Sequence, residues 1–263
     1  MTVRAFELLA GEKKLKIVKE DSLLGGHVWP AATALCQYLA KTANDSRLRG
    51  ATVECLELGS GTGAVGIYAA AVFGYNVTVT EYRPPSGSAD RLELLQQNVD
   101  ANCDLFSSTK ELPRVLELDF GDVAMRKHVL DASRTGQGYD LILASDVTYT
   151  PGLHEPVAQS ISELLAQNTT TNGNGDSSHD STGLPTCLLS HQERLLNVRG
   201  EDYQLYQFEQ ALSNANLCVV KRSFYDIQDE EEACCEKTHR ICVLEIQRGP
   251  PTKSGDLSMM PLK

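Results

Sequence analysis

Apolar residues follow two alternating patterns along this chain. Short continuous apolar runs are typical of buried strands, and segments with an apolar residue at every third or fourth position are typical of amphipathic helices. The runs predict strands at 53–58, 76–80, 114–118, 139–144 and 186–190. The periodic segments predict helices at 30–40, 63–73, 90–102, 123–130, 153–166 and 203–215. Two further runs, 218–224 and 240–247, predict consecutive strands with no helix between them.

This order of elements predicts an α/β fold. Strands that alternate with helices form a parallel sheet with helices on both faces. Two consecutive strands at the end of the chain form an antiparallel pair. We therefore expect a doubly wound, Rossmann-like, seven-stranded sheet that is mostly parallel and has an antiparallel C-terminal strand pair.

The segments outside this alternation divide the chain into three parts. Residues 1–50 form an N-terminal extension with a Trp-Pro segment, a helix and a short hairpin or edge strand. Residues 51–248 form the main domain, and residues 249–263 form a loose tail. Residues 167–183 are poor in apolar side chains and rich in turn formers, which indicates a disordered surface insertion. The acidic run 229–232 is interpreted as a solvated loop.

Composition narrows the class of protein. No apolar run is long enough to span a membrane, and the charged N-terminus lacks the apolar core of a secretion signal. A net charge of −11 argues against nucleic-acid partners and is compatible with a basic substrate. The eight cysteines lack metal-site spacing and several lie in apolar runs, so we expect no bound metal and a reducing compartment. These features predict a cytoplasmic protein, with the nucleus also open, and we expect a monomer.

Candidate chemistry begins in the glycine-rich turn after the first main strand. Residues 61–66 match GxGxxG, which alone is a weak sign of a nucleotide site. Ligands of doubly wound sheets lie over the carboxyl ends of the strands, where three further strands end in Glu81, Asp119-Phe120 and Ser145-Asp146. Glu81 stands about twenty residues after the glycines, a position suited to binding ribose hydroxyls. Asp119 and Phe120 suit the amino group and face of a purine.

These residues carry a family resemblance. Residues 57–63, Glu-Leu-Gly-Ser-Gly-Thr-Gly, resemble the first motif of the seven-β-strand (class I) S-adenosylmethionine-dependent methyltransferases. Together with Trp29-Pro30 and the sequence Asp-Val-Thr-Tyr at 146–149, they resemble the Asp-x-x-Tyr-motif protein lysine methyltransferase group, the methyltransferase-21-like family. The resemblance spans about residues 25–247 and makes 51–248 a methyltransferase domain.

The resemblance implies S-adenosylmethionine as the cofactor and a lysine of a protein, such as a chaperone or translation factor, as the acceptor. Asp146 and Tyr149 would face the acceptor. The residues that would contact the cofactor are Trp29, Gly59, Ser60, Gly61, Gly63, Glu81, Asp119, Phe120 and Ser145. Two positions depart from the group's pattern: Phe120 replaces a usual tryptophan, and His191 replaces a frequent tyrosine.

Several alternatives stay open on sequence alone. The literal GxGxxG also fits an NAD-dependent oxidoreductase, and the superfamily motif also fits a small-molecule N-methyltransferase or a scaffold without catalysis. Trp29 could pack in the core instead of covering the ligand. Asp146 could cap the region that follows it, with Tyr149 packed beneath.

Overall fold

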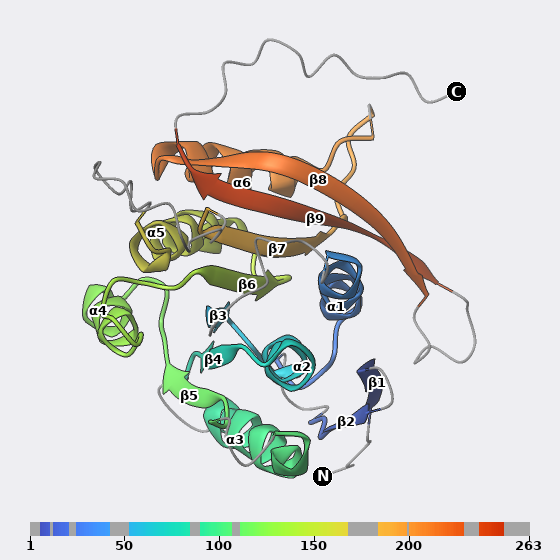
Figure 1. Ribbon diagram of the computed structural model, residues 1–263. Helices are drawn as coiled ribbons and strands as arrows, with labels where there is room; N and C mark the ends of the chain where they lie inside the picture. The colour runs from blue at the N-terminus through green and yellow to red at the C-terminus, as the bar shows by residue number, and fades with distance from the viewer. Residues whose placement is uncertain are drawn as a thin grey trace, which may run out of the picture.

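The computed structural model describes residues 6–10, 13–20, 25–42, 53–84, 90–106, 111–167, 184–198, 200–228 and 237–249. These residues form a seven-stranded sheet covered by helices on both faces, with a two-stranded hairpin beside it (Figure 1). The strands of the large sheet are β3 (Glu54–Leu58), β4 (Asn76–Glu81), β5 (Arg114–Glu117), β6 (Leu141–Ser145), β7 (Thr186–Gln192), β8 (Leu217–Gln228) and β9 (Thr238–Arg248). The helices are α1 (Pro30–Thr42), α2 (Ala64–Phe73), α3 (Arg91–Ala101), α4 (Val123–Asp131), α5 (His154–Leu164) and α6 (Tyr203–Asn214).

The strand order of the large sheet is β5-β4-β3-β6-β7-β9-β8. Strands β5, β4, β3, β6 and β7 run parallel to one another, whereas β9 runs antiparallel to both β7 and β8. The predicted fold class is therefore confirmed. The chain winds outward from β3 to β5 and then from β6 to the opposite edge, so the topological switch point lies between β3 and β6.

Side chains alternate between the two faces of the sheet and build two cores. Cys55, Val77, Val79, Leu141 and Leu143 pack with α1, α2 and α3 on one face. Their neighbours along the same strands pack with α4, α5 and α6 on the other, among them Leu56, Leu58, Ile142 and Ala144. This period of two is the pattern of a strand buried on both faces, and it explains why these strands read as continuous apolar runs.

The predicted elements are all present, and the strands at the C-terminal edge are longer than predicted. Strand β7 continues to Gln192 because Ser190, His191 and Gln192 pair with residues of β9. Strands β8 and β9 pair along their whole length, from Leu217 opposite Arg248 at one end to Gln228 opposite Thr238 at the other. Polar side chains end the apolar pattern before the backbone pairing ends, so the sequence-based boundaries were too short there.

The predicted N-terminal hairpin is confirmed as β1 (Phe6–Ala10) and β2 (Lys13–Ile17). Two buried asparagines, one in α3 and one directly after it, bind the backbone of β2 and of the residue that follows it. The side chain of Asn102 accepts from Lys16 N (2.9 Å) and donates to Lys16 O (2.8 Å). Asn98 accepts from Val18 N (2.6 Å) and donates to Val18 O (3.1 Å) and Thr62 O (2.9 Å). Asn98 thus joins the N-terminal segment to the glycine-rich loop.

Some predictions fall wholly or largely outside the described residues: the insertion at 167–183, the acidic run at 229–232 and the tail beyond 249. Six cysteines lie within the described ranges and are free, namely Cys36, Cys55, Cys103, Cys187, Cys218 and Cys242. Within those ranges, no helix combines the length and apolar character needed to cross a membrane.

Candidate active site

A cavity of about 650 Å³ lies at the carboxyl ends of β3, β4, β5 and β6. Its wall contains the predicted site residues from the ends of these four strands, together with Trp29 from the segment before α1 and Tyr149 from the loop after β6. Gly63 is the single predicted site residue outside this wall. The sheet thus brings together side chains that stand more than a hundred residues apart in the chain.

The loop after β3 has a backbone shape that suits glycine. Gly59 and Gly61 have φ values of +59° and +54°, in the left-handed region. A Cβ on Gly61 would lie 2.7 Å from Gly25 O, because the N-terminal segment crosses the loop at this point. A Cβ on Gly59 would lie 2.9 Å from Val147 Cγ1. The absence of side chains lets other segments approach the loop closely.

Gly63 has a different role in the packing. It precedes α2 with φ +78°, and a Cβ there would lie 2.5 Å from Leu95 Cδ1 on α3. Its backbone N–H donates to Ser60 O at 2.8 Å. Gly63 therefore lets α2 start close to α3 and closes the loop.

Glu57, on β3, is a cavity residue that the sequence interpretation did not assign. Its carboxyl group is buried, Oε2 accepts from Gly66 N at 3.0 Å, and Oε1 has no hydrogen-bond partner among the residues that the structure describes. Burial raises the pKa of Glu57 to about 8. The sign of Glu57 in the sequence is its place two residues before Gly59, within the glycine-rich motif. An unpartnered buried oxygen in a cavity wall indicates a ligand that donates a hydrogen bond there.

Glu81, the last residue of β4, is fixed by backbone donors. Oε2 accepts from Gly61 N at 2.8 Å and Oε1 accepts from Tyr82 N at 3.0 Å. Arg91 Nη1, at the start of α3, lies 3.5 Å from Oε1. The carboxylate therefore holds the glycine loop in place and faces the cavity at the same time.

Asp119 and Phe120 follow β5. Asp119 Oδ1 accepts from Gly121 N at 2.8 Å, and Phe120 O accepts from Arg126 Nη1 at 2.6 Å. The Phe120 ring lies against the backbone of Gly59, since a Cβ on that glycine would be 3.3 Å from Phe120 Cζ. The ring forms a rigid wall of the cavity next to the glycine loop.

Two aromatic side chains stand at the cavity with their surfaces partly open to solvent. Trp29 and Tyr149 are each 39% exposed. The Trp29 ring lies 5.7 Å from the His27 ring, whose residue also lines the cavity. Trp29 is therefore a cavity-wall residue and not a core tryptophan, and Tyr149 is not packed beneath Asp146.

Asp146 forms a bidentate ion pair with Arg194 instead of capping the residues that follow it. Arg194 Nη1 donates to Asp146 Oδ1 at 2.8 Å and Nη2 donates to Oδ2. Gln192 N donates to Oδ1 at 3.4 Å. Asp146 is buried and has φ +55°, so its backbone holds a strained conformation at the end of β6. Arg194 lines the cavity but had no assigned role, because its partner is 48 residues away.

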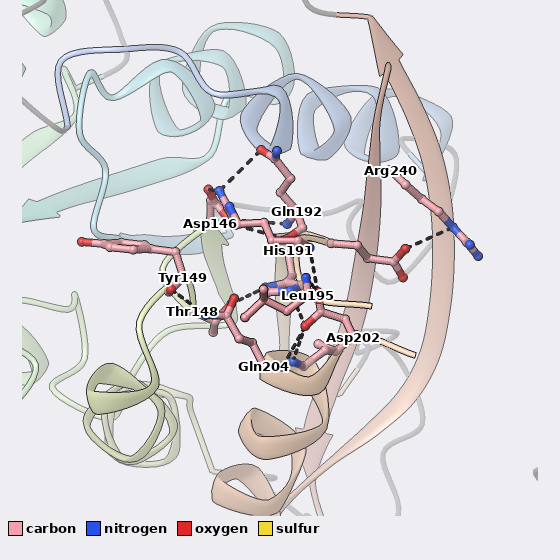
Figure 2. A network of polar contacts seen from close by, with 12 residues as sticks. Asp146, Thr148, Tyr149, His191, Gln192, Leu195, Asp202, Gln204 and Arg240 are labelled. Atoms are coloured by element: carbon pink, nitrogen blue, oxygen red, sulfur yellow. Dashed lines mark hydrogen bonds and ion pairs between the residues drawn. The ribbon is translucent and has the colours of Figure 1, made fainter. Parts of the chain in front are cut away.

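A buried polar network supports this pair from behind (Figure 2). Arg194 N donates to Asp202 Oδ2 at 2.7 Å, and Asp202 Oδ1 caps α6 by accepting from Gln204 N at 2.8 Å. His191 lies between Thr148 Oγ1 (2.7 Å from Nδ1) and Asp202 Oδ1 (3.5 Å from Nε2). Burial alone would raise the pKa of Asp202, but the neighbouring His191 ring and hydrogen bonds from backbone N–H groups outweigh it and hold that pKa well below its usual range. The loops after β6 and β7 and the start of α6 are thereby tied together.

Comparison with known proteins supports the resemblance stated above. A family profile described as "Lysine methyltransferase" matches residues 10–174. The chain is 37% identical over 171 residues to protein N-lysine methyltransferase METTL21A of Danio rerio, covering 64% of each chain. It is 32% identical over 142 residues to EEF1A lysine methyltransferase 3 of Xenopus tropicalis, covering 54% of this chain and 53% of that protein. The aligned part thus spans less than two thirds of the length of both relatives.

Solved structures share the fold at low sequence identity. A SAM-dependent methyltransferase structure from Methanosarcina mazei superposes with a TM-score of 0.50 at 9% identity, covering 77% of this chain and 95% of that one. A structure from work on the conversion of a disulfide bond into a thioacetal group during echinomycin biosynthesis gives 0.52 at 11% identity over 81% of each chain. These likenesses show the fold alone. The family profile covers more than half of the chain, and on that ground this protein belongs to the lysine methyltransferase family.

Proposed function

We propose that this protein transfers a methyl group from S-adenosylmethionine to a lysine side chain of a protein substrate. One observation carries the proposal: a single cavity joins the glycine loop and Glu81 on one side with Asp146, Tyr149 and Trp29 on the other. Methyl transfer needs a cofactor site and an acceptor site that meet, and positioning of the two reactants supplies much of its rate. We also propose residues 51–248 as the methyltransferase domain.

The cavity wall fits the cofactor that the family implies. The side-chain-free loop at Gly59 and Gly61 leaves room for the methionine portion, and the unpartnered Oε1 of Glu57 suits its ammonium group. Glu81 would accept from the ribose hydroxyls, while Asp119 and Phe120 would hold the adenine by its amino group and its face. Trp29, Ser60 and Ser145 complete the proposed contacts, and Gly63 contributes by closing the loop. When bound, the cofactor supplies an electrophilic methyl group on a sulfonium.

The acceptor would enter beside Asp146, Tyr149 and Trp29. Aromatic faces tolerate both an amine and a methylated ammonium, so the two exposed rings suit the walls of a lysine channel. Asp146 is fixed by its strained backbone and by Arg194, so it can orient an amine without moving. The carboxylate replaces the neutral amide of Asn-Pro-Pro-Tyr motifs that bind planar nitrogens, which favours a lysine over a nucleobase.

The substrate class follows from charge and from the relatives. A protein with a net charge of −11 attracts basic segments of a partner. The name of the frog relative states EEF1A as its substrate, so EEF1A is the first candidate to test for this chain.

Two assays test the proposal against its alternatives. A thermal-shift screen with S-adenosylmethionine, S-adenosylhomocysteine, NAD and NADP should show stabilisation by the first two ligands, because ligands that bind the folded state raise its melting temperature. Stabilisation by NAD alone would favour an oxidoreductase. Tritium from labelled cofactor should then enter EEF1A or lysate protein. Label in the metabolite fraction alone would favour a small-molecule methyltransferase, and binding without transfer would favour a scaffold.

A further inference from the structure

The ion pair between Asp146 and Arg194 changes what the acceptor meets in the cavity. A lone carboxylate would attract the ammonium form of a lysine, which is unreactive because its lone pair carries a proton. Here the carboxylate is already neutralised by a guanidinium in a bidentate contact. Both side chains line the same cavity, so an incoming ammonium faces a positive charge as well as a negative one.

The hydrogen-bond count at Asp146 leaves room for one further donor. A carboxylate has about four acceptor positions on its two oxygens. Oδ1 accepts from Arg194 Nη1 and Gln192 N, and Oδ2 accepts from Arg194 Nη2. Counting the described residues, one acceptor position on Oδ2 is therefore left. It suits an N–H of a neutral amine, whose nitrogen lone pair then stays available for attack.

We propose that Arg194 is a positioning residue that makes the acceptor subsite select the neutral amine of lysine. This inference rests on the proposed function and specifies the protonation state in which the acceptor binds. Further contacts hold Arg194 in place, because its side chain also donates to Gln192 O at 3.1 Å and its backbone N–H donates to Asp202. A lysine that enters as an ammonium loses its proton to water before it occupies the position beside Oδ2.

The charged groups around the pair are consistent with this role. Asp202 accepts from the backbone N–H of Arg194, and His191 Nε2 lies 3.5 Å from Asp202 Oδ1. Glu193 lies 3.3 Å from Arg240 on β9. Although burial alone would lower it, the pKa of Arg194 is raised by hydrogen bonding to Asp146, so the guanidinium stays charged. The titratable groups that share the cavity wall are His27, Glu57, Glu81, Tyr82, Arg91, Asp119 and Tyr149.

A permanently charged probe tests the subsite without turnover. We would titrate n-butyltrimethylammonium, a cation of lysine-like length, into the wild type and Arg194→Gln, with and without S-adenosylhomocysteine, and follow binding by ligand-observed NMR. Arg194→Gln removes the positive charge and leaves the Asp146 carboxylate without its cation. The affinity of the variant for the probe should therefore rise about tenfold, the same factor as a shift of one pKa unit in a bound lysine. Arg194→Lys should restore weak binding. Equal affinity in the wild type and Arg194→Gln would overturn the proposal.

Transfer kinetics give a second test. With tritiated S-adenosylmethionine and lysate protein as the acceptor pool, Arg194→Gln should lower both the maximal rate at pH 7.5 and the apparent KM, because the ammonium form now binds unproductively. The pH at which the maximal rate is half-reached should move up by about one unit. A purely structural role would instead raise KM and leave the pH profile unchanged, which would contradict the proposal.

Arg240→Gln is the matched control. Arg240 also pairs with a carboxylate, Glu193, but lies outside the cavity wall. This variant should retain the wild-type cation affinity and pH profile. If the wild-type protein transfers no label, the proposed function fails, whereas the cation titration still decides whether Arg194 sets the charge of the subsite.

Discussion

The two halves of the cavity are built in different ways. The cofactor half consists of strand ends and backbone: the loop after β3 follows one short motif, and Glu81 holds it through a bond to Gly61 N. The acceptor half consists of side chains from distant loops: Asp146 follows β6, and its partner Arg194 follows β7. The first half depends on local backbone shape, whereas the second depends on one long-range ion pair.

Because the two halves are built differently, they tolerate substitution differently. A glycine loop fixed by positive φ values and close backbone approach tolerates little substitution. An ion pair between loops sets the charge of a subsite and can be altered without reshaping the fold. Substitutions in the two halves should therefore have separable effects on cofactor binding and on transfer.

The largest effect is expected at Asp146. Asp146→Ala should lower methyl transfer by about a hundredfold or more, because a misplaced acceptor loses the benefit of positioning. The measurement is tritium transfer at saturating cofactor. Asp146→Asn keeps the shape of the side chain and should show the same loss. Near-normal transfer in both variants would mean that Asp146 does not serve the acceptor.

Glu81→Ala should act on the other half. It removes the proposed ribose acceptor and leaves Gly61 N without its partner, so the Kd for S-adenosylmethionine should rise about thirtyfold, or about 2 kcal/mol. Isothermal titration calorimetry measures this change. Glu117→Ala is the control. Glu117, on β5, lies beside Glu81 of β4 in the sheet but is outside the cavity wall. The ribose assignment would be wrong if the two variants bound the cofactor equally well.

A substitution at Asn98 tests how much the bonds between the N-terminal segment and the glycine loop contribute to stability. Asn98→Ala should lower the free energy of unfolding by about 2 kcal/mol, because it leaves the partly buried backbone groups of Val18 and the buried carbonyl of Thr62 without their Asn98 partner. Urea denaturation measures the loss. Gln97→Ala, at an exposed neighbouring position, should change stability by no more than about 0.5 kcal/mol. Equal, small effects would show that the asparagine is dispensable.

Glu57 gives the most gradual effect, a dependence of stability on pH. Its pKa of about 8 in the folded protein exceeds the ordinary value of 4.5, so the folded state binds the proton more tightly than the unfolded state. The stability that this proton adds is fully present below pH 4.5 and falls as pH rises toward 8, by up to about 1.4 kcal/mol per pH unit. Unfolding of the cofactor-free protein at pH 5 to 8 should show a flatter profile for Glu57→Gln. Identical slopes would contradict a buried, protonated Glu57.

Most of the fold and of the cofactor half could be predicted from sequence, since both follow local patterns. Buried strands read as apolar runs, and the residues that end them meet at one edge of the sheet. The ion pair at Asp146 could not be predicted, because neither residue carries a local sign of the other. The ends of β7, β8 and β9 were missed for a related reason: backbone pairing continues past the point where the apolar pattern stops.

The most direct test of two separately built halves is the affinity of Asp146→Ala for S-adenosylmethionine, measured by calorimetry beside the wild type and Glu81→Ala. The structure predicts a Kd within about threefold of the wild-type value, since the contacts that hold the glycine loop do not involve Asp146. A loss of cofactor affinity as large as that of Glu81→Ala would contradict the division of the cavity into a cofactor half and an acceptor half.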